Sequence, residues 1–218
     1  MQKRDYVLAM FEDFGRALAR VLRLGETRQF AEAWVEVGHA AEEFLGITTQ
    51  QLETMLAADL IALARTGNGE EDTARWLLLV ELLQVSGDLY QQEGREAAAV
   101  VFYLKALDVA TQVSQRRERL PYFITRFDGL MLRLDGYVLP AGIGLSLMRG
   151  YEQAEQFAQA EDVLFHLLED HPGDESILEA GLSLYDRLLQ LSDFKLQSGG
   201  LPRDEVEESL AELLDLKG

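Results

Sequence analysis

Glu36 and His39 are the first residues along the chain whose types and spacing could perform chemistry. A Glu-x-x-His motif places a carboxylate and an imidazole on one helical face, the spacing used by di-iron carboxylate bundles. Such a site needs a second Glu-x-x-His motif, and the sequence has none. Trp34, Val37 and Phe44 lie in the same segment, which is the pattern of an ordinary amphipathic helix. We therefore expect no metal at this position.

The remaining candidates for metal, nucleotide or catalytic chemistry are equally sparse. His166 and His171 are five residues apart, which places them on different faces of a helix. The sequence has no cysteine, so zinc would need histidine and carboxylate ligands alone. No phosphate-binding glycine motif is present, and Gly142-Ile143-Gly144 is more typical of a turn than of a phosphate cradle. The sequence predicts no catalytic residue, no cofactor and no metal.

An arginine-rich stretch offers the clearest binding chemistry in the sequence. Arginine can hold a carboxylate with two parallel hydrogen bonds, so this stretch could bind an acidic peptide or the C-terminal carboxylate of a polypeptide. The alternative is an electrostatic clamp onto the protein's own acidic C-terminal third. The candidate partner-binding residues are Arg116, Arg117, Arg119, Tyr122, Arg126, Arg133 and Tyr137.

The charge distribution argues against nucleic acid as a partner. The formal net charge is −18, and the phosphates of nucleic acid require a basic surface. Residues 1–94 carry 8 basic and 16 acidic side chains, and residues 151–218 carry 4 basic and 17 acidic ones. Residues 95–149 between them carry 8 basic and 5 acidic side chains. The middle of the sequence is therefore mildly basic between two acidic flanks.

Composition favours an all-α protein. Hydrophobic residues make up 48% of the 218 residues, enough for a sizeable core, and only four prolines are present to interrupt helices. We expect about 9–11 helices in a single domain over residues 1–218, with a subdivision at 66–69 as an alternative. No signal peptide and no membrane span is expected, and the cytoplasm is the expected location.

Apolar spacing predicts that these helices form short-looped antiparallel hairpins. Thr48 or Thr49 should cap a short helix, with Glu53 bonding back towards the cap. One long helix is expected over residues 175–196. The uncharged run 136–147 is either a buried connection or an apolar interface that a second copy of the protein could cover.

One hairpin carries a recognisable repeat pattern. Its residues are Leu83, Gly87, Tyr90, Gly94, Ala99, Tyr103, Ala106 and Leu107, and their spacing resembles the tetratricopeptide repeat. In that family small residues mark close helix crossings and large ones fill the gaps, so Gly87 and Ala99 should be contact positions and Tyr90 and Tyr103 fillers. Thr111 stands where a proline is usual.

Two weaker copies of the pattern centre on Ala33 and Ala160, which lie 66 residues before and 61 residues after Ala99. Met148 stands in the latter copy where the family has a small residue. The irregular spacing favours a degenerate array of antiparallel helical hairpins. The entry Arg4-Asp5-Tyr6 is also similar to that of an uncharacterised family of bacterial proteins, which implies a fold and no chemistry.

The sequence therefore predicts a non-enzymatic helical-repeat protein that binds a protein or peptide, with its own copy among the candidate partners. One alternative is a sensor with a small-molecule or peptide pocket inside the helical array near Tyr122, Phe123 and Tyr137. The other alternative is an enzyme of unrecognised type.

Overall fold

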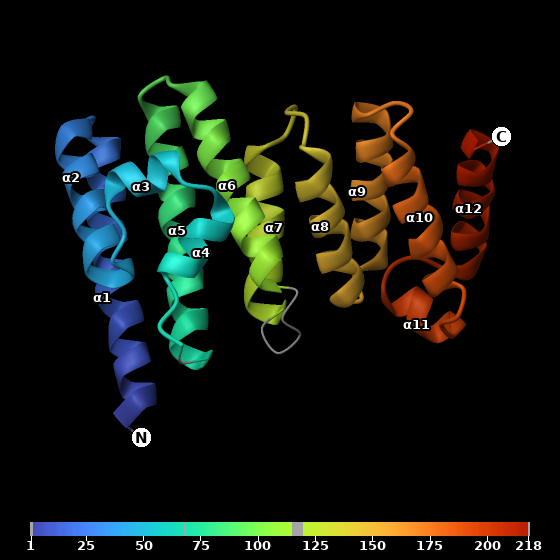
Figure 1. The fold of residues 1–218 in the computed structure, drawn as a ribbon, viewed down its shortest axis with the longest axis horizontal. Coiled ribbons are helices and arrows are strands. Elements are labelled where there is room, and N and C mark those ends of the chain that lie inside the picture. The colour runs from blue at the N-terminus through green and yellow to red at the C-terminus, as the bar shows by residue number, and fades with distance from the viewer. Residues whose placement is uncertain (1, 68, 115–119, 218) are drawn as a thin grey trace. The chain divides into compact units, whose positions relative to one another are not determined.

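The regular secondary structure of the described residues is entirely helical (Figure 1). A computed structural model describes residues 2–67, 69–114 and 120–217. Over those residues it contains twelve α-helices, one π-helix and no strand. The all-α class predicted from the sequence is confirmed, and the number of helices exceeds the expected 9–11.

The additional helix comes from a break in the predicted helix over 175–196. That segment forms two helices, α10 (Glu175–Leu188) and α11 (Asp193–Ser198). Ser192 is the reason for the break. Its backbone is extended and its side chain accepts a hydrogen bond from the backbone N–H of Lys195, which starts a new helix.

Contacts divide the protein into two compact units, which we describe separately. Unit 1 comprises Met1–Val113 and Thr125–Asp135, and unit 2 comprises Ser114–Ile124 and Gly136–Gly218. Residues 66–69, where the sequence allowed a subdivision, lie within unit 1. The helix α7 (Leu120–Arg133) contributes its first residues to unit 2 and the rest to unit 1.

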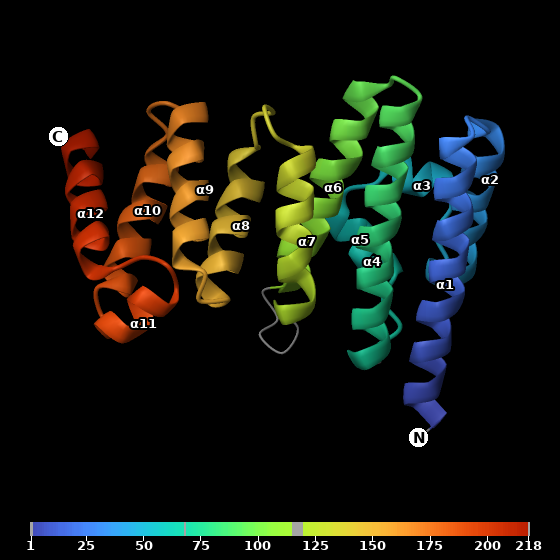
Figure 2. The ribbon, with the colours of Figure 1, turned by 180° about the vertical axis from the view of Figure 1, so that it is seen from behind.

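Unit 1 is built around α5 (Gly69–Gln92), which contributes many of its buried side chains. Trp76, Leu79 and Leu82 of α5 are fully buried, and α1 packs against both α2 and α5 (Figure 2). The helices of this unit besides α7 are α1 (Gln2–Glu26), α2 (Phe30–Ala40), the π-helix η1 (Ala41–Leu45), α3 (Thr49–Thr54), α4 (Ala57–Leu63), α5 (Gly69–Gln92) and α6 (Glu96–Ser114).

The close crossing predicted between α5 and α6 is present. A Cβ built on Gly87 would stand 2.5 Å from Cε1 of Tyr103, so only glycine leaves room for the ring. The Tyr103 hydroxyl donates to Asp88 Oδ1 at 2.8 Å. Ala99 and Tyr90 are also buried, at the contact and filler positions that the spacing assigned to them.

The cap of α3 differs from expectation in one residue. Thr48 caps the helix, and Gln51 rather than Glu53 bonds back to the Thr48 backbone N–H, at 2.8 Å. Glu53 instead accepts a hydrogen bond from the Tyr90 hydroxyl at 3.0 Å. Burial, together with this hydrogen bond to Glu53, raises the pKa of Tyr90 to about 12. Glu53 therefore ties α3 to α5.

Unit 2 contains the second close hairpin and the three C-terminal helices. A Cβ on Gly144 of α8 would stand 2.4 Å from Cδ2 of Leu167 on α9, so these two helices cross closely at that glycine. Besides the first residues of α7, unit 2 contains α8 (Ala141–Gln153), α9 (Phe157–Asp170), α10, α11 and α12 (Arg203–Lys217). The turn expected at Gly142-Ile143-Gly144 is wrong, because these residues lie inside α8.

The uncharged run 136–147 is divided between core and surface. Leu139 and Leu147 are buried, whereas Val138 is 58% exposed. Part of the run lies in α8, so it is neither wholly a connection nor wholly an apolar surface.

Three hairpins share the same turn. Arg28, Gly94 and Glu155 all have positive φ, of 58°, 77° and 60°. Each donates its N–H to the carbonyl three residues earlier, and the next residue donates to the carbonyl five residues earlier, which is the Schellman motif. Each lies five residues before a buried alanine, namely Ala33, Ala99 and Ala160. The three alanines that the sequence pattern aligned therefore each follow the same type of turn at the same distance.

One described helix, α6, is long and apolar enough to cross a membrane by length and composition. Its window has a mean hydropathy of 1.2, and 56% of that window is buried inside the protein. Burial of this kind is typical of a core helix.

Candidate functional site

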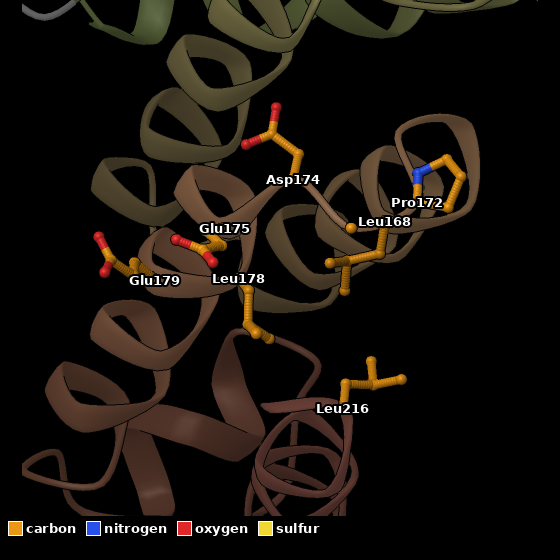
Figure 3. Close-up of a pocket in the computed structure, with 8 residues that line it drawn as sticks. Leu168, Pro172, Asp174, Glu175, Leu178, Glu179 and Leu216 are labelled. Carbon is orange, nitrogen blue, oxygen red and sulfur yellow. The ribbon is translucent and has the colours of Figure 1, made fainter. Parts of the chain in front are cut away.

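A groove lies between helices α9, α10 and α12 of unit 2. It has a volume of about 570 Å³. Leu168 of α9, Leu178 of α10 and Leu216 of α12 face this space, and the carboxylates of Glu175 and Glu179 lie along one side (Figure 3). The floor is therefore apolar and one edge is acidic.

The frame of the groove depends on a glycine in α10. A Cβ on Gly181 would stand 2.7 Å from Leu213 of α12 and 2.9 Å from Leu164 of α9. Gly181 therefore lets α10 pack closely against both neighbours at once. Leu213 and Leu164 are fully buried in this contact. The three helices that supply the leucines of the groove are thus held at fixed positions.

A partly buried polar network crosses the same three helices. The Tyr185 hydroxyl of α10 donates to Glu161 Oε1 of α9, and Ser209 of α12 hydrogen-bonds with both residues. Burial raises the pKa of Glu161 despite the hydrogen bonds from Tyr185 and Ser209, which favour the carboxylate. Burial also raises the pKa of Tyr185. The network adds directional contacts to the apolar packing.

The loop between α9 and α10 forms the rim of the groove and is fixed at both ends. His171 Nε2 lies 2.7 Å from the carbonyl oxygen of Leu139, so this nitrogen carries the proton. Asp174 caps α10 by accepting from the Ser176 N–H at 2.9 Å. The hydrogen bonds from the Ser176 hydroxyl and N–H lower the pKa of Asp174. Gly173 between them has a φ of 80°, which favours glycine.

The C-terminal segment that contains the groove is strongly acidic. Residues 151–218 carry 17 acidic side chains and 4 basic ones. Arg187 pairs with Glu152 at 2.6 Å, Lys195 pairs with Glu155 at 2.8 Å, and Arg203 pairs with Asp193. These are all the lysine and arginine side chains beyond Gly150 that the structure describes up to residue 216. Among the residues whose side chains are described, no lysine or arginine lines the groove.

A second, smaller pocket in unit 2 holds about 170 Å³. Two of the ion pairs just described, Arg187–Glu152 and Lys195–Glu155, line it. Because these charged groups are paired with one another, this pocket offers fewer unpaired groups to a ligand than the groove does.

The candidate residues predicted from the arginine-rich stretch are only partly within the described structure. Arg116, Arg117 and Arg119 lie outside the described residues. The backbone of Tyr122 lies in α7, and its side chain is not described. Tyr137 lies between α7 and α8 and is half-buried. The groove and the smaller pocket of unit 2 are both lined by other residues.

The two described arginines of that stretch are held by α5. Arg133 binds Asp88 with two parallel bonds, from Nε to Oδ1 at 2.7 Å and from Nη2 to Oδ2 at 3.0 Å. Arg126 Nε pairs with Glu81 Oε1. These carboxylates belong to unit 1 and not to the C-terminal third, which the clamp interpretation named. Two of the predicted partner-binding cations are therefore engaged within the protein itself.

Arg133 also lies beside Tyr103. Its guanidinium carbon is 6.0 Å from the centre of the Tyr103 ring, and both residues contact Asp88. Burial, followed by the hydrogen bond to Asp88, raises the pKa of Tyr103. The hydrogen bond to Asp88 is also the main cause that raises the pKa of Arg133. Arg133 of α7 therefore contacts both α5, through Asp88, and α6, through Tyr103, at their close crossing.

No metal site is found among the described residues. Glu36 pairs with Arg20 at 3.0 Å, and His39 is exposed. The Glu-x-x-His spacing is therefore part of an amphipathic helix with a polar edge.

The leucines of the groove carried no signal in the sequence. Leu168, Leu178 and Leu216 lie in three different helices, and each follows an unremarkable apolar spacing. The sequence feature that comes closest to marking the groove is the helix-breaking segment His171-Pro172-Gly173-Asp174. It indicates a turn between two helices.

Comparison with known families assigns the chain to a family whose function is unknown. The chain belongs to a family of unknown function, because a model described as "Family of unknown function (DUF6483)" matches residues 1–218. This membership is consistent with the resemblance to an uncharacterised family noted from the sequence. A search of curated proteins and a search of solved structures each found no match.

Proposed function

We propose that this protein is a non-enzymatic helical-repeat protein that binds a peptide segment of another protein. The observation that carries the proposal is the groove of about 570 Å³ with a floor of Leu168, Leu178 and Leu216. Leu216 is 61% exposed, although apolar side chains gain free energy when they are removed from water. A partner that covers these leucines would supply that gain.

The resemblance of the array to tetratricopeptide hairpins supports this proposal. The repeated Schellman turns at Arg28, Gly94 and Glu155 give three hairpins a common register. Helical-repeat proteins offer extended surfaces for peptides and proteins. The array is degenerate, since the close crossing of α8 lies at Gly144, one turn before Met148, and the proline position is occupied by Thr111.

A small-molecule ligand is the second candidate. The volume of the groove falls within the range of about 300–1,000 Å³ that small-molecule sites occupy. The groove differs from the sensor pocket expected near Tyr122, Phe123 and Tyr137, because helices α9, α10 and α12 form it.

A peptide-display selection on the full-length protein tests the proposal. A library of peptides is selected on the immobilised protein, and enriched sequences are then measured individually by fluorescence anisotropy. We expect enriched peptides to lose at least roughly tenfold in affinity for Leu216→Glu, because this change places a charge on the apolar floor. Leu216 is exposed, so the variant should fold, which circular dichroism verifies.

The matched control is Leu132→Glu, which makes the same chemical change at a leucine of α7 that is 77% exposed and outside the groove. This variant should bind like the unmodified protein. Failure to enrich any peptide, or equal binding by Leu216→Glu, would refute the peptide-binding function. Metabolites that shift the melting temperature of the protein but not of Leu216→Glu would favour the small-molecule candidate.

A further inference from the structure

We infer that the groove of α9, α10 and α12 selects a basic amphipathic helix of a partner protein. This inference rests on the proposed function and specifies the class of ligand. Its basis is the combination of a leucine floor with a carboxylate edge in a part of the protein whose described cations are already paired.

The apolar floor sets the first requirement on the partner. Leu168, Leu178 and Leu216 come from three helices and converge on one space (Figure 3). The space of about 570 Å³ suits a few apolar side chains rather than a whole domain. The partner must therefore present a short apolar stripe.

The form of the partner follows from what the groove lacks. No described residue forms a strand, so no described sheet edge is available for strand addition. The groove has no aromatic lining of the kind that binds polyproline helices, and no arginine cluster for phosphorylated or acidic motifs. The remaining common mode is an amphipathic helix that lays its apolar face into a hydrophobic groove.

The charge of the partner follows from the carboxylates on the groove. Glu175 and Glu179 are exposed and lie on the same face of α10, four residues apart. Asp174 is engaged in capping α10, so these two glutamates are the carboxylates of the lining that are free to meet a ligand. The described lysine and arginine side chains of residues 151–216 lie outside the groove and are paired with Glu152, Glu155 and Asp193. Lysine or arginine flanking the apolar stripe would complement this edge.

Two designed peptides test the inference. The first is a labelled helix of about 14 residues, or about four turns, with leucines on one face and lysines elsewhere. The second has glutamate in place of every lysine. Anisotropy with the full-length protein should show binding of the lysine peptide and at least roughly tenfold weaker binding of the glutamate peptide. Raising the ionic strength from about 0.1 M to about 1 M shortens the Debye length from about 10 Å to about 3 Å, so it should weaken binding of the lysine peptide.

Paired substitutions locate the interaction. The double variant Glu175→Gln with Glu179→Gln should weaken the lysine peptide roughly fivefold, as expected for the loss of two exposed ion pairs. The control Glu207→Gln with Glu208→Gln makes the same change in net charge on α12, at exposed residues outside the groove. This control should leave the affinity nearly unchanged.

The outcomes separate this inference from the broader proposal. Equal binding of the two peptides, or equal weakening by the two double variants, would overturn the inference. Display-selected peptides that depend on Leu216 but carry no positive charge would overturn the inference and leave the peptide-binding function in place. A dimer seen by sedimentation that dissociates on Leu216→Glu would assign the groove to a second copy of the protein and also refute a separate basic partner.

Discussion

Gly87 of α5 and Tyr103 of α6 lie in direct contact, with the tyrosine ring against the glycine backbone. A Cβ at Gly87 would stand 2.5 Å from Cε1 and 2.7 Å from Cδ1 of the ring. The ring is also held by its hydroxyl, which donates to Asp88 at 2.8 Å. It therefore has little freedom to move away from an added side chain.

The substitution Gly87→Ala should consequently destabilise unit 1. Overpacking of a filled core costs about 1–3 kcal/mol, and the gain in helix propensity offsets at most about 1 kcal/mol of that cost. Urea unfolding followed by tryptophan fluorescence measures the effect. Both tryptophans, Trp34 and Trp76, lie in unit 1, so the signal reports on the unit that carries the change.

The control for this prediction is Gly15→Ala in α1. A Cβ at Gly15 would meet nothing within 4 Å, and α1 belongs to the same unit. This change should stabilise the protein by about 0.5–1 kcal/mol, because alanine loses less conformational entropy in a helix than glycine does. If the two substitutions changed the free energy of unfolding by the same amount in the same direction, the close contact between Gly87 and Tyr103 would be contradicted.

The repeated turns give a second prediction, with opposite signs at equivalent positions. Gly94→Ala should lower the free energy of unfolding by about 1 kcal/mol, because φ is 77° there and a side chain strains the left-handed conformation. Arg28→Gly should raise it by up to about 1 kcal/mol, because Arg28 has a φ of 58° in the same motif. Both residues lie in unit 1, so tryptophan fluorescence in urea measures both changes. A loss of stability in Arg28→Gly would contradict the idea that the turn itself, rather than the arginine side chain, determines the effect.

The ion pair of Arg133 gives a third prediction. Arg133→Gln should destabilise unit 1 by about 1–3 kcal/mol, because it removes a two-bond contact and leaves Asp88 without its cation. The control Arg23→Gln removes an exposed arginine of α1 that has no ion pair among the described residues, so its effect should stay within about 0.5 kcal/mol. Urea unfolding compares the two variants. If Arg133→Gln left stability unchanged and weakened a partner instead, Arg133 would belong to a binding site, as its sequence context suggested.

The sequence predicted the parts of the fold that depend on local pattern. Gly87, Ala99 and Tyr103 could be assigned because one repeat fixes which residue types meet at a helix crossing. The same reasoning failed at Met148, since the crossing of α8 uses Gly144 instead. The break before α11 was also missed, because Ser192 follows an apolar pattern that continues without glycine or proline. A serine can cap a new helix or lie inside a continuing one, and the local sequence did not distinguish these two cases at Ser192.

The groove could not be predicted, for a different reason. Leu168 and Leu216 are brought together by the packing of α10 between α9 and α12, which Gly181 allows. No local pattern states which helices will be neighbours. The arginine-rich stretch was identified because its charge is visible in the sequence, whereas the partners of Arg126 and Arg133, Glu81 and Asp88, lie 45 residues earlier in both cases. Charge alone did not reveal whether those cations were free.

The half-buried carboxylate of Glu161 gives a fourth prediction, on pH dependence. Burial raises the pKa of Glu161 above its ordinary value of 4.5, even though Tyr185 and Ser209 hydrogen-bond with it. The folded protein therefore binds more protons at this site than the unfolded protein does between that value and the raised pKa. Stability contributed by this residue must fall as the pH rises through that window.

Glu161→Gln keeps an oxygen that can accept the hydrogen bond of Tyr185 and removes the titration. The variant should therefore gain stability relative to the unmodified protein as the pH rises from about 4.5 to neutral. Unit 2 contains no tryptophan, so urea unfolding is followed by circular dichroism at a series of pH values. The difference between the two proteins isolates Glu161 from the other carboxylates. A difference that shrinks as the pH rises would show that the hydrogen bonds, and not burial, dominate the pKa of Glu161.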